Sequence, residues 1–208
     1  MAKSKRAKKS SAWADRQNRD EFVQKARKQG YRARAAFKLE QIDKKYRLIR
    51  SNCVVVDLGS SPGSWSQYVA DKVGSTGEIF AVDLIEMPDI ENVSFIHGDF
   101  TDQETVMALI SELDGRQVDL VLSDMAPNIT GIASADQAKC ELILHSILGF
   151  CEKALRPGGT LLFKLFEGEA SNTARRELKT RFDASQVIKP DASRSRSKEI
   201  YFLARAFR

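Results

Sequence analysis

Cysteine and histidine are scarce in this chain, which has three cysteines and two histidines among 208 residues. Cys53, Cys140 and Cys151 form no C-x-x-C pair. The sequence therefore predicts neither a disulfide framework nor a zinc site, and we expect buried thiols and no bound metal. An odd number of isolated cysteines is typical of a reducing compartment, which indicates a cytoplasmic protein.

Long apolar runs are also missing. The best candidate, residues 142–150, contains His145 and Ser146 and is much shorter than the roughly 20 apolar residues of a membrane helix. The basic N-terminal residues do not lead into an apolar signal core. We therefore expect a soluble chain that neither spans a membrane nor is secreted.

No internal repeat or long linker divides the sequence. With 42% hydrophobic and 29% charged residues, the chain can bury one sizeable core. We expect a basic, flexible tail over residues 1–17 and a single domain over residues 18–208, with an N-terminal helical addition at 18–50. No self-association stripe is evident, so a monomer is expected.

The net charge of +5 is unevenly distributed. Residues 1–11 contain five Lys or Arg and no acid, and residues 25–34 contain five more basic residues. A polyanion would be attracted to this end of the chain. A solvated tail that only aids solubility is the alternative for residues 1–11.

Helical and strand patterns alternate along the chain, which predicts an α/β fold with a mostly parallel sheet and helices on both faces. The polar loop 191–198 is too short for a crossover, so the seven-stranded sheet should end in an antiparallel hairpin. Helices are expected at 20–30, 34–46, 65–73, 102–113, 137–155 and 173–182, and strands at 54–57, 78–83, 93–96, 118–123, 160–165, 186–189 and 199–204.

The segment from Val54 to Trp65 changes abruptly from an apolar strand to a glycine-containing turn. Asp57 lies at the carboxyl end of this strand, and Gly59 and Gly63 follow around Pro62. Such a turn lets a ligand approach the backbone amides at the start of the next helix, so it predicts a nucleotide-type pocket. An ordinary strand-to-helix turn is the alternative.

Acidic residues follow the next strands of the predicted sheet. Asp83 ends the second strand, where a carboxylate can accept hydrogen bonds from the hydroxyls of a ribose. Asp99 and Phe100 follow the third strand, where a carboxylate can accept from an exocyclic amine and an aromatic or backbone group can border an adenine ring. Helix capping is the alternative for Asp99.

Two lysines occupy unusual positions for a cation. Lys38 lies at the edge of the apolar stripe of helix 34–46, and Lys164 follows the apolar run Leu161–Phe163. Asp124 ends the strand next to that of Lys164, and Glu199 begins the last strand. We expect these four side chains to converge at one edge of the sheet. A snorkelling Lys38 and a structural salt bridge at Lys164 are the alternatives.

Five motifs in this order resemble the FtsJ-type (RrmJ-type) methyltransferases, from about Tyr31 to Tyr201. They are Asp57-Leu-Gly-Ser-Ser-Pro-Gly-Ser-Trp65, Asp83-Leu84, His97-Gly-Asp-Phe100, Ser123-Asp-Met-Ala-Pro-Asn128 and Ser193-Arg-Ser-Arg-Ser-Lys-Glu-Ile-Tyr201. Ser60-Ser61 departs from the Ala-Ala or Ala-Pro of many relatives but keeps a small residue.

The resemblance implies a class I S-adenosylmethionine-dependent methyltransferase with a Rossmann-like fold. It assigns cofactor contacts to Gly63, Trp65, Asp83, Asp99 and Asp124, to which the turn and strand-end patterns add Gly59 and Phe100. It also implies that Lys38, Asp124, Lys164 and Glu199 form the catalytic Lys-Asp-Lys-Glu tetrad, with Lys164 as the principal residue. Whether Lys164 acts as a neutral base or as a cation that stabilises an alkoxide is left open by the sequence.

The resemblance further implies methylation of a ribose 2′-hydroxyl, in a uridine of the A-loop of 23S-type RNA on the assembled large ribosomal subunit. DNA is excluded because it has no 2′-hydroxyl. The basic segment 25–38, with Lys189, Arg194 and Arg196, should bind RNA phosphates. A nicotinamide oxidoreductase, an RNA base N-methyltransferase and a non-catalytic RNA-binding ribosome assembly factor are the alternatives.

Overall fold

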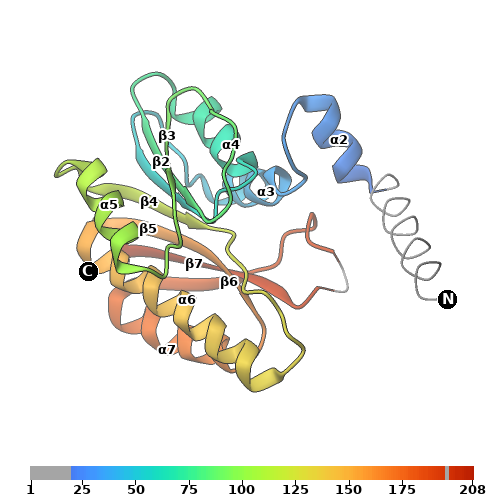
Figure 1. Cartoon of the computed structure of the whole chain (residues 1–208), viewed down its shortest axis with the longest axis vertical. Helices are drawn as coiled ribbons and strands as arrows, with labels where there is room; N and C mark the ends of the chain where they lie inside the picture. Colours follow the sequence, from blue (N-terminus) through green and yellow to red (C-terminus); the bar gives the residue numbers. More distant parts are fainter. Residues whose placement is uncertain (1–19, 195–196) are drawn as a thin grey trace.

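The computed structural model describes residues 20–194 and 197–208, so the whole of the predicted basic tail, residues 1–17, lies outside the described residues. A seven-stranded sheet forms the centre, with the order β3-β2-β1-β4-β5-β7-β6 (Figure 1). The first five strands in this order are parallel, and β7 runs antiparallel to both β5 and β6. The predicted fold class and its terminal hairpin are therefore confirmed. The strands are β1 (Val54–Leu58), β2 (Glu78–Asp83), β3 (Val93–His97), β4 (Val118–Ser123), β5 (Leu155–Phe166), β6 (Phe182–Ile188) and β7 (Glu199–Phe207).

Helices cover both faces of the sheet. One face packs against α3 and α4, and the other packs against α5, α6 and α7 (Figure 1). Side chains of β1 point to both faces of the sheet. Val55 packs toward α3 and α4, whereas Val56 and Leu58 pack toward α5, α6 and α7. The helices are α2 (Glu21–Gln29), α3 (Ala36–Tyr46), α4 (Ser64–Val73), α5 (Gln103–Leu113), α6 (Ala133–Ala154) and α7 (Glu169–Arg181).

The N-terminal addition is fixed to the domain at both of its helices. Asp20 caps α2 through Phe22 N and Val23 N, and Gly30 ends that helix in the left-handed region. Arg34 then donates to the carbonyl of Ala192, in the loop between β6 and β7. This attachment places α3 beside the beginning of β7, where Lys38 and Glu199 meet.

Four elements begin earlier than predicted, and local chemistry explains two of these differences. The segment Pro157-Gly158-Gly159 was expected to separate a helix from a strand, but α6 ends at Ala154 and β5 already begins at Leu155. The register changes from Val118↔Leu155 to Leu120↔Thr160, so the glycines form an irregularity inside the strand. Similarly, α6 begins four residues earlier than residue 137, because Asp136 accepts from Thr130 N and Gly131 N in the preceding turn. Helix α7 and strand β6 likewise begin at Glu169 and Phe182, earlier than expected.

Two predictions about composition can be compared with the structure. All three cysteines are buried and free, as expected. None of the helices in the described ranges is both long and apolar enough to cross a membrane.

Candidate active site

The turn after β1 contains two glycines that no other residue could replace without strain. Gly59 has φ +76°, and a Cβ atom there would lie 2.3 Å from the Cγ atom of Met125. Gly63 has φ +101°, caps the start of α4, and would clash with the side chains of Ile90 and Arg32. The turn is therefore closely packed between the β4 and β2 ends of the sheet edge.

A cavity of about 450 Å³ lies at this carboxyl edge. Five of the predicted cofactor residues line it, namely Gly59, Asp83, Asp99, Phe100 and Asp124. Its mouth carries the exposed apolar side chains of Leu84, Ile85 and Leu142, which suit a flat aromatic ring.

Gly63 and Trp65 do not line this cavity. Trp65 is 2% exposed, and its indole N–H donates to the carbonyl of Ala35 at 2.8 Å. Its ring centroid lies 5.9 Å from that of Tyr201. The structure thus places Trp65 as a link between α4, α3 and β7, and a cofactor contact by Gly63 or Trp65 stays a prediction.

The strand-end carboxylates are held by backbone amides. Asp83 accepts from Ser61 N and Ile85 N, each at 2.8 Å, so it fixes the turn after β1. Asp99 accepts from the amide and the hydroxyl of Thr101. A carboxylate has about four lone-pair sites, so both residues retain capacity for hydroxyl or amine donors of a ligand. Phe100 borders the cavity while its ring packs edge-on against Phe150.

The four predicted tetrad residues meet as two ion pairs. Lys164 Nζ lies 2.7 Å from Asp124 Oδ1, and Lys38 Nζ lies 2.7 Å from Glu199 Oε1. All four side chains are largely buried, with exposed fractions between 9% and 18%. Lys164 also donates to the backbone carbonyl of Asp124. Four side chains from α3, the end of β4, β5 and β7 therefore come together beside the cavity.

Tyr201 joins the two pairs, and sequence reasoning missed its role. It lies directly opposite Lys164 in the β5–β7 ladder, and its hydroxyl donates to Asp124 Oδ1 at 2.7 Å. Lys38 Nζ lies 5.7 Å from the centre of its ring. The signal in the sequence was its spacing of two from Glu199, which places both side chains on one face of a strand.

Lys139 was also left without a role by the sequence. It lines the cavity from α6 and donates to the carbonyl of Asn128. It therefore holds the loop after β4 against α6.

Burial and charge change the acid–base properties of this edge. Burial raises the pKa of Glu199, but the hydrogen bond and charge of Lys38 outweigh it and hold the pKa below its usual range. Burial, followed by the charge of Asp124, raises the pKa of Tyr201 well above its ordinary value, so its hydroxyl remains a donor. Complete burial raises the pKa of Asp57 to about 7, although Ser66 donates to it.

The arrangement suits the alkylation of a hydroxyl by a positively charged donor. The carboxylates of Asp83, Asp99 and Asp124 can accept from ribose and amino groups and balance a cationic charge. Lys164 lies beside Asp124. Within the described residues, no group of three or more His, Cys, Asp or Glu side chains is arranged to hold a metal ion.

Comparisons with known proteins point to one family. The family model of FtsJ-like methyltransferases matches residues 31–207. Two relatives are named Ribosomal RNA large subunit methyltransferase E: that of Alkalilimnicola ehrlichii is 46% identical, covering 100% of this chain and 99% of its own, and that of Azoarcus sp. is 47% identical, covering 96% and 97%. A crystal structure from Plasmodium falciparum, named as a ribosomal RNA methyltransferase, superposes with a TM-score of 0.74 at 31% identity, covering 85% of this chain and 98% of that one. The chain belongs to the FtsJ-like methyltransferase family.

Proposed function

We propose that this protein transfers a methyl group from S-adenosylmethionine to a ribose 2′-hydroxyl of large-subunit ribosomal RNA. The observation that carries the proposal is the pairing of Lys164 with Asp124 and of Lys38 with Glu199, next to the carboxylate-lined cavity. A base N-methyltransferase alkylates a nitrogen, so it has no ribose hydroxyl proton to remove and does not need a lysine placed to accept one. The names of the relatives support the RNA class of the substrate.

The cavity at the carboxyl edge is the proposed cofactor site. Asp83 would accept from the ribose hydroxyls and Asp99 from the adenine amine, while Leu84 and Ile85 border the ring. S-adenosylmethionine supplies an electrophilic methyl group on a sulfonium. Asp124 lines the same cavity and pairs with Lys164, so it connects the cofactor site with the tetrad.

Lys164 is the proposed general base. A hydroxyl is a poor nucleophile, and its proton must leave as the oxygen attacks. The neutral amine of Lys164 accepts that proton and becomes an ammonium group, which then pairs with Asp124. Tyr201 donates to the same carboxylate and holds it in position. Lys38 and Glu199 position the ribose from the side of α3. Correct placement of the two reactants supplies on the order of 7 to 11 kcal/mol of the barrier reduction.

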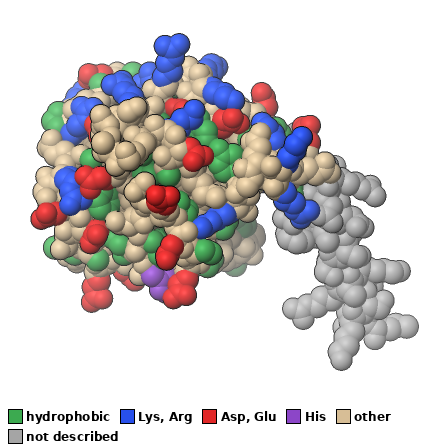
Figure 2. Space-filling view, turned by 90° about the horizontal axis from the view of Figure 1, so that it is seen from above, with side chains coloured by type: hydrophobic (Ala, Val, Ile, Leu, Met, Phe, Trp, Pro, Cys, Tyr) green, Lys and Arg blue, Asp and Glu red, His purple; other side chains and the backbone are tan. Residues whose placement is uncertain are grey.

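Basic residues near the tetrad are the proposed RNA contacts. A smaller cavity beside the tetrad is lined by Arg34, Lys38, Arg194 and Glu199. Lys189 lies in the loop between β6 and β7 and donates to the carbonyl of Ser197. Arg196 lies outside the described residues. On the face shown in Figure 2, Lys and Arg side chains are most frequent along the upper part of the molecule, with Asp and Glu side chains among them. A uridine of the A-loop on the assembled subunit is the proposed target.

The reaction class is tested by product analysis. The protein is incubated with labelled S-adenosylmethionine and with large ribosomal subunits that lack the modification, and the nucleosides are then examined by mass spectrometry. We expect one 2′-O-methyluridine. Label on a base would support the N-methyltransferase, and RNA binding without any label transfer would support a non-catalytic assembly factor.

Two substitutions of Lys164 test its role. Lys164→Arg keeps the positive charge but cannot lose its proton, so it should abolish single-turnover methylation as fully as Lys164→Ala does. Lys153→Ala, at an exposed position of α6, is the control and should retain full activity. Substantial activity of Lys164→Arg, with the fold confirmed by thermal melting, would show that Lys164 acts as a cation and not as a base.

A further inference from the structure

A second cavity, of about 780 Å³, lies at the opposite edge of the sheet from the tetrad. Its walls come from the end of α3, from α4, from the first half of β5 and from the end of β7. Because β7 begins at Glu199 and Arg205 lies six residues further on, the two sites are about 20 Å apart along this strand. They occupy opposite ends of the same strand and of the same helix α3. We name this second site the basic cavity.

Five Lys or Arg side chains line the basic cavity, and most of them are not neutralised. Lys44 pairs with Glu40 at 2.7 Å. The other four form no ion pair with any carboxylate of the described residues, and three of these four are exposed to solvent. The four are Arg47, Arg50, Lys72 and Arg205.

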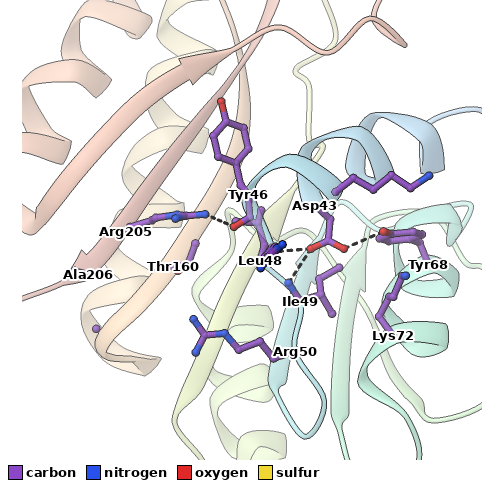
Figure 3. A pocket seen from close by; sticks show the side chains of 13 residues that line it. Asp43, Tyr46, Leu48, Ile49, Arg50, Tyr68, Lys72, Thr160, Arg205 and Ala206 are labelled. Atoms are coloured by element: carbon purple, nitrogen blue, oxygen red, sulfur yellow. Dashed lines mark hydrogen bonds between the residues drawn. The ribbon is translucent and has the colours of Figure 1, made fainter.

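The floor of the basic cavity explains why these cations stay unpaired. Asp43 is the single carboxylate that lines it, and Asp43 Oδ1 accepts from Leu48 N and Ile49 N at 2.8 and 2.9 Å. Asp43 Oδ2 accepts from the hydroxyl of Tyr68 at 2.9 Å, as Figure 3 shows. Asp43 is buried, and both of its carboxylate oxygens are occupied by structural hydrogen bonds.

Arg205 approaches the cavity from β7. Its guanidinium group donates to the carbonyl of Tyr46 (Figure 3), whereas its buried Nε has no hydrogen-bond partner. Arg205 therefore brings a positive charge to the inner wall without a carboxylate to balance it. An anion entering the cavity would meet this charge together with those of Arg50 and Lys72 at the rim.

We infer that the basic cavity binds backbone phosphates of the RNA substrate, at a distance from the methylated nucleotide. Unpaired cations around a concave surface concentrate a polyanion, and phosphate contacts of this kind fix the orientation of a nucleic acid. The unpaired cations come from three separate segments, namely the loop after α3, α4 and β7, which favours a chain of phosphates over one small anion. The inference rests on the proposed function, since α3 and β7 also carry Lys38 and Glu199.

The test compares two triple variants that remove the same charge. One variant carries Arg47→Gln, Arg50→Gln and Lys72→Gln in the basic cavity. The matched control carries Lys153→Gln, Arg176→Gln and Lys179→Gln on α6 and α7, and all six side chains are exposed. Binding of a labelled fragment of large-subunit ribosomal RNA is measured without methyl donor over a series of salt concentrations, and thermal melting confirms that both variants are folded.

The cavity variant should bind the RNA about tenfold more weakly, and its slope of log affinity against log salt should fall by about 2 to 3. The control should change both quantities much less. Equal weakening in the two variants would overturn the inference, because net charge alone would then explain the effect. A second result would also overturn the inference. In it, inorganic phosphate protects the wild type but not the cavity variant from thermal unfolding, while both proteins bind the RNA equally well.

The same samples separate this inference from the proposed function. Methylation of large ribosomal subunits by the wild type is measured in parallel. Absence of methyl transfer by a wild type that still binds RNA would count against the proposed function alone, and the binding comparison would still decide whether the cavity contacts RNA.

Discussion

Tyr201 is the residue on which the geometry of the tetrad most depends. Its buried hydroxyl donates to the same oxygen of Asp124 that pairs with Lys164. Tyr201→Phe removes a hydrogen bond to a charged group, so it should lower the free energy of unfolding by about 1.5 to 3 kcal/mol. It should also lower kcat for methylation about tenfold, because Asp124 is then free to rotate away from Lys164. Urea unfolding and steady-state kinetics measure the two effects.

A purely structural effect of Tyr201→Phe can be recognised with a second variant. Ile79→Val shortens a fully buried side chain at the far end of β2 and should cost about 0.5 to 1.5 kcal/mol. We expect its kcat to be unchanged. Equal losses of kcat in both variants would show that Tyr201 acts through stability alone.

Asp57 gives the fold a defined dependence on pH. The folded state keeps its proton up to a pKa of about 7, whereas an unfolded chain releases it near 3.8. The folded state therefore binds more protons between these values, and this residue lowers the free energy of unfolding as the pH rises from about 4 to 7. Asp57→Asn removes the effect. Between pH 5 and 8, its stability relative to the wild type should improve by about 2 to 3 kcal/mol, measured by urea unfolding. Parallel pH curves for the two proteins would contradict this.

The place of a residue in the site could be predicted where a sequence motif contains that residue. It could not be predicted where it depends on tertiary packing. Lys38, Asp124, Lys164 and Glu199 could be assigned from their positions in strands and a helix, and the structure brings all four together. Their positions left open whether Glu199 would hold the ribose or Lys38, and the structure pairs it with Lys38. Tyr201 was overlooked because an aromatic residue in a buried strand is ordinarily a core residue.

At the scale of elements, Trp65 decides how α3 is attached to the domain. Its indole N–H donates to the carbonyl of Ala35, which precedes the first residue of α3. Trp65→Phe keeps an aromatic ring but removes this bond, so it should lower the free energy of unfolding by about 1 kcal/mol. The affinity for S-adenosylmethionine should stay within about twofold of wild type, whereas kcat falls because Lys38 is less well placed. A loss of cofactor affinity above tenfold, measured by calorimetry, would instead support the cofactor contact that the sequence motif implied for Trp65.

Arg32 makes the second attachment of the addition. Its guanidinium donates to the carbonyls of Pro62, Pro88 and Asp89, so it connects the turn after β1 with the loop after β2. Sequence reasoning assigned this arginine to RNA binding as part of a basic segment. Its three carbonyl partners could not be foreseen, since backbone acceptors leave no trace in the sequence.

Hydrophobic periodicity located the strands and helices well. The errors are in the positions where elements begin, which depend on contacts with neighbouring strands and loops. Glycines after a helix predict an end, but in β5 they lie within a strand because β4 continues to pair with it at Leu155. That pairing is a long-range contact. The start of α6 likewise depended on which loop amides Asp136 would cap.

At the scale of the whole molecule, both ends of the chain contribute to one edge. Lys38 from the N-terminal addition and Glu199 from the last strand form a single ion pair, although 161 positions separate them. The tetrad therefore exists only when the complete sheet and the addition are assembled. The rule that parallel strands present their carboxyl ends at one edge predicted the place of Asp124 and Lys164. Glu199 reaches the same edge because it begins the antiparallel strand β7.

The surface charge of the molecule predicts that its two ligands respond differently to salt. Ribosomal RNA would be held by phosphate contacts with basic side chains, each contributing roughly 0.7 to 0.9 to the slope of log affinity against log salt. With three contacts, raising the salt from 50 to 200 mM should weaken RNA binding roughly 20- to 40-fold. The cofactor would be bound in a cavity lined by carboxylates and apolar groups, so its affinity should change less than about twofold. Fluorescence anisotropy with labelled RNA and calorimetry with S-adenosylmethionine measure the two responses, and an RNA affinity that is insensitive to salt would contradict an electrostatic contact.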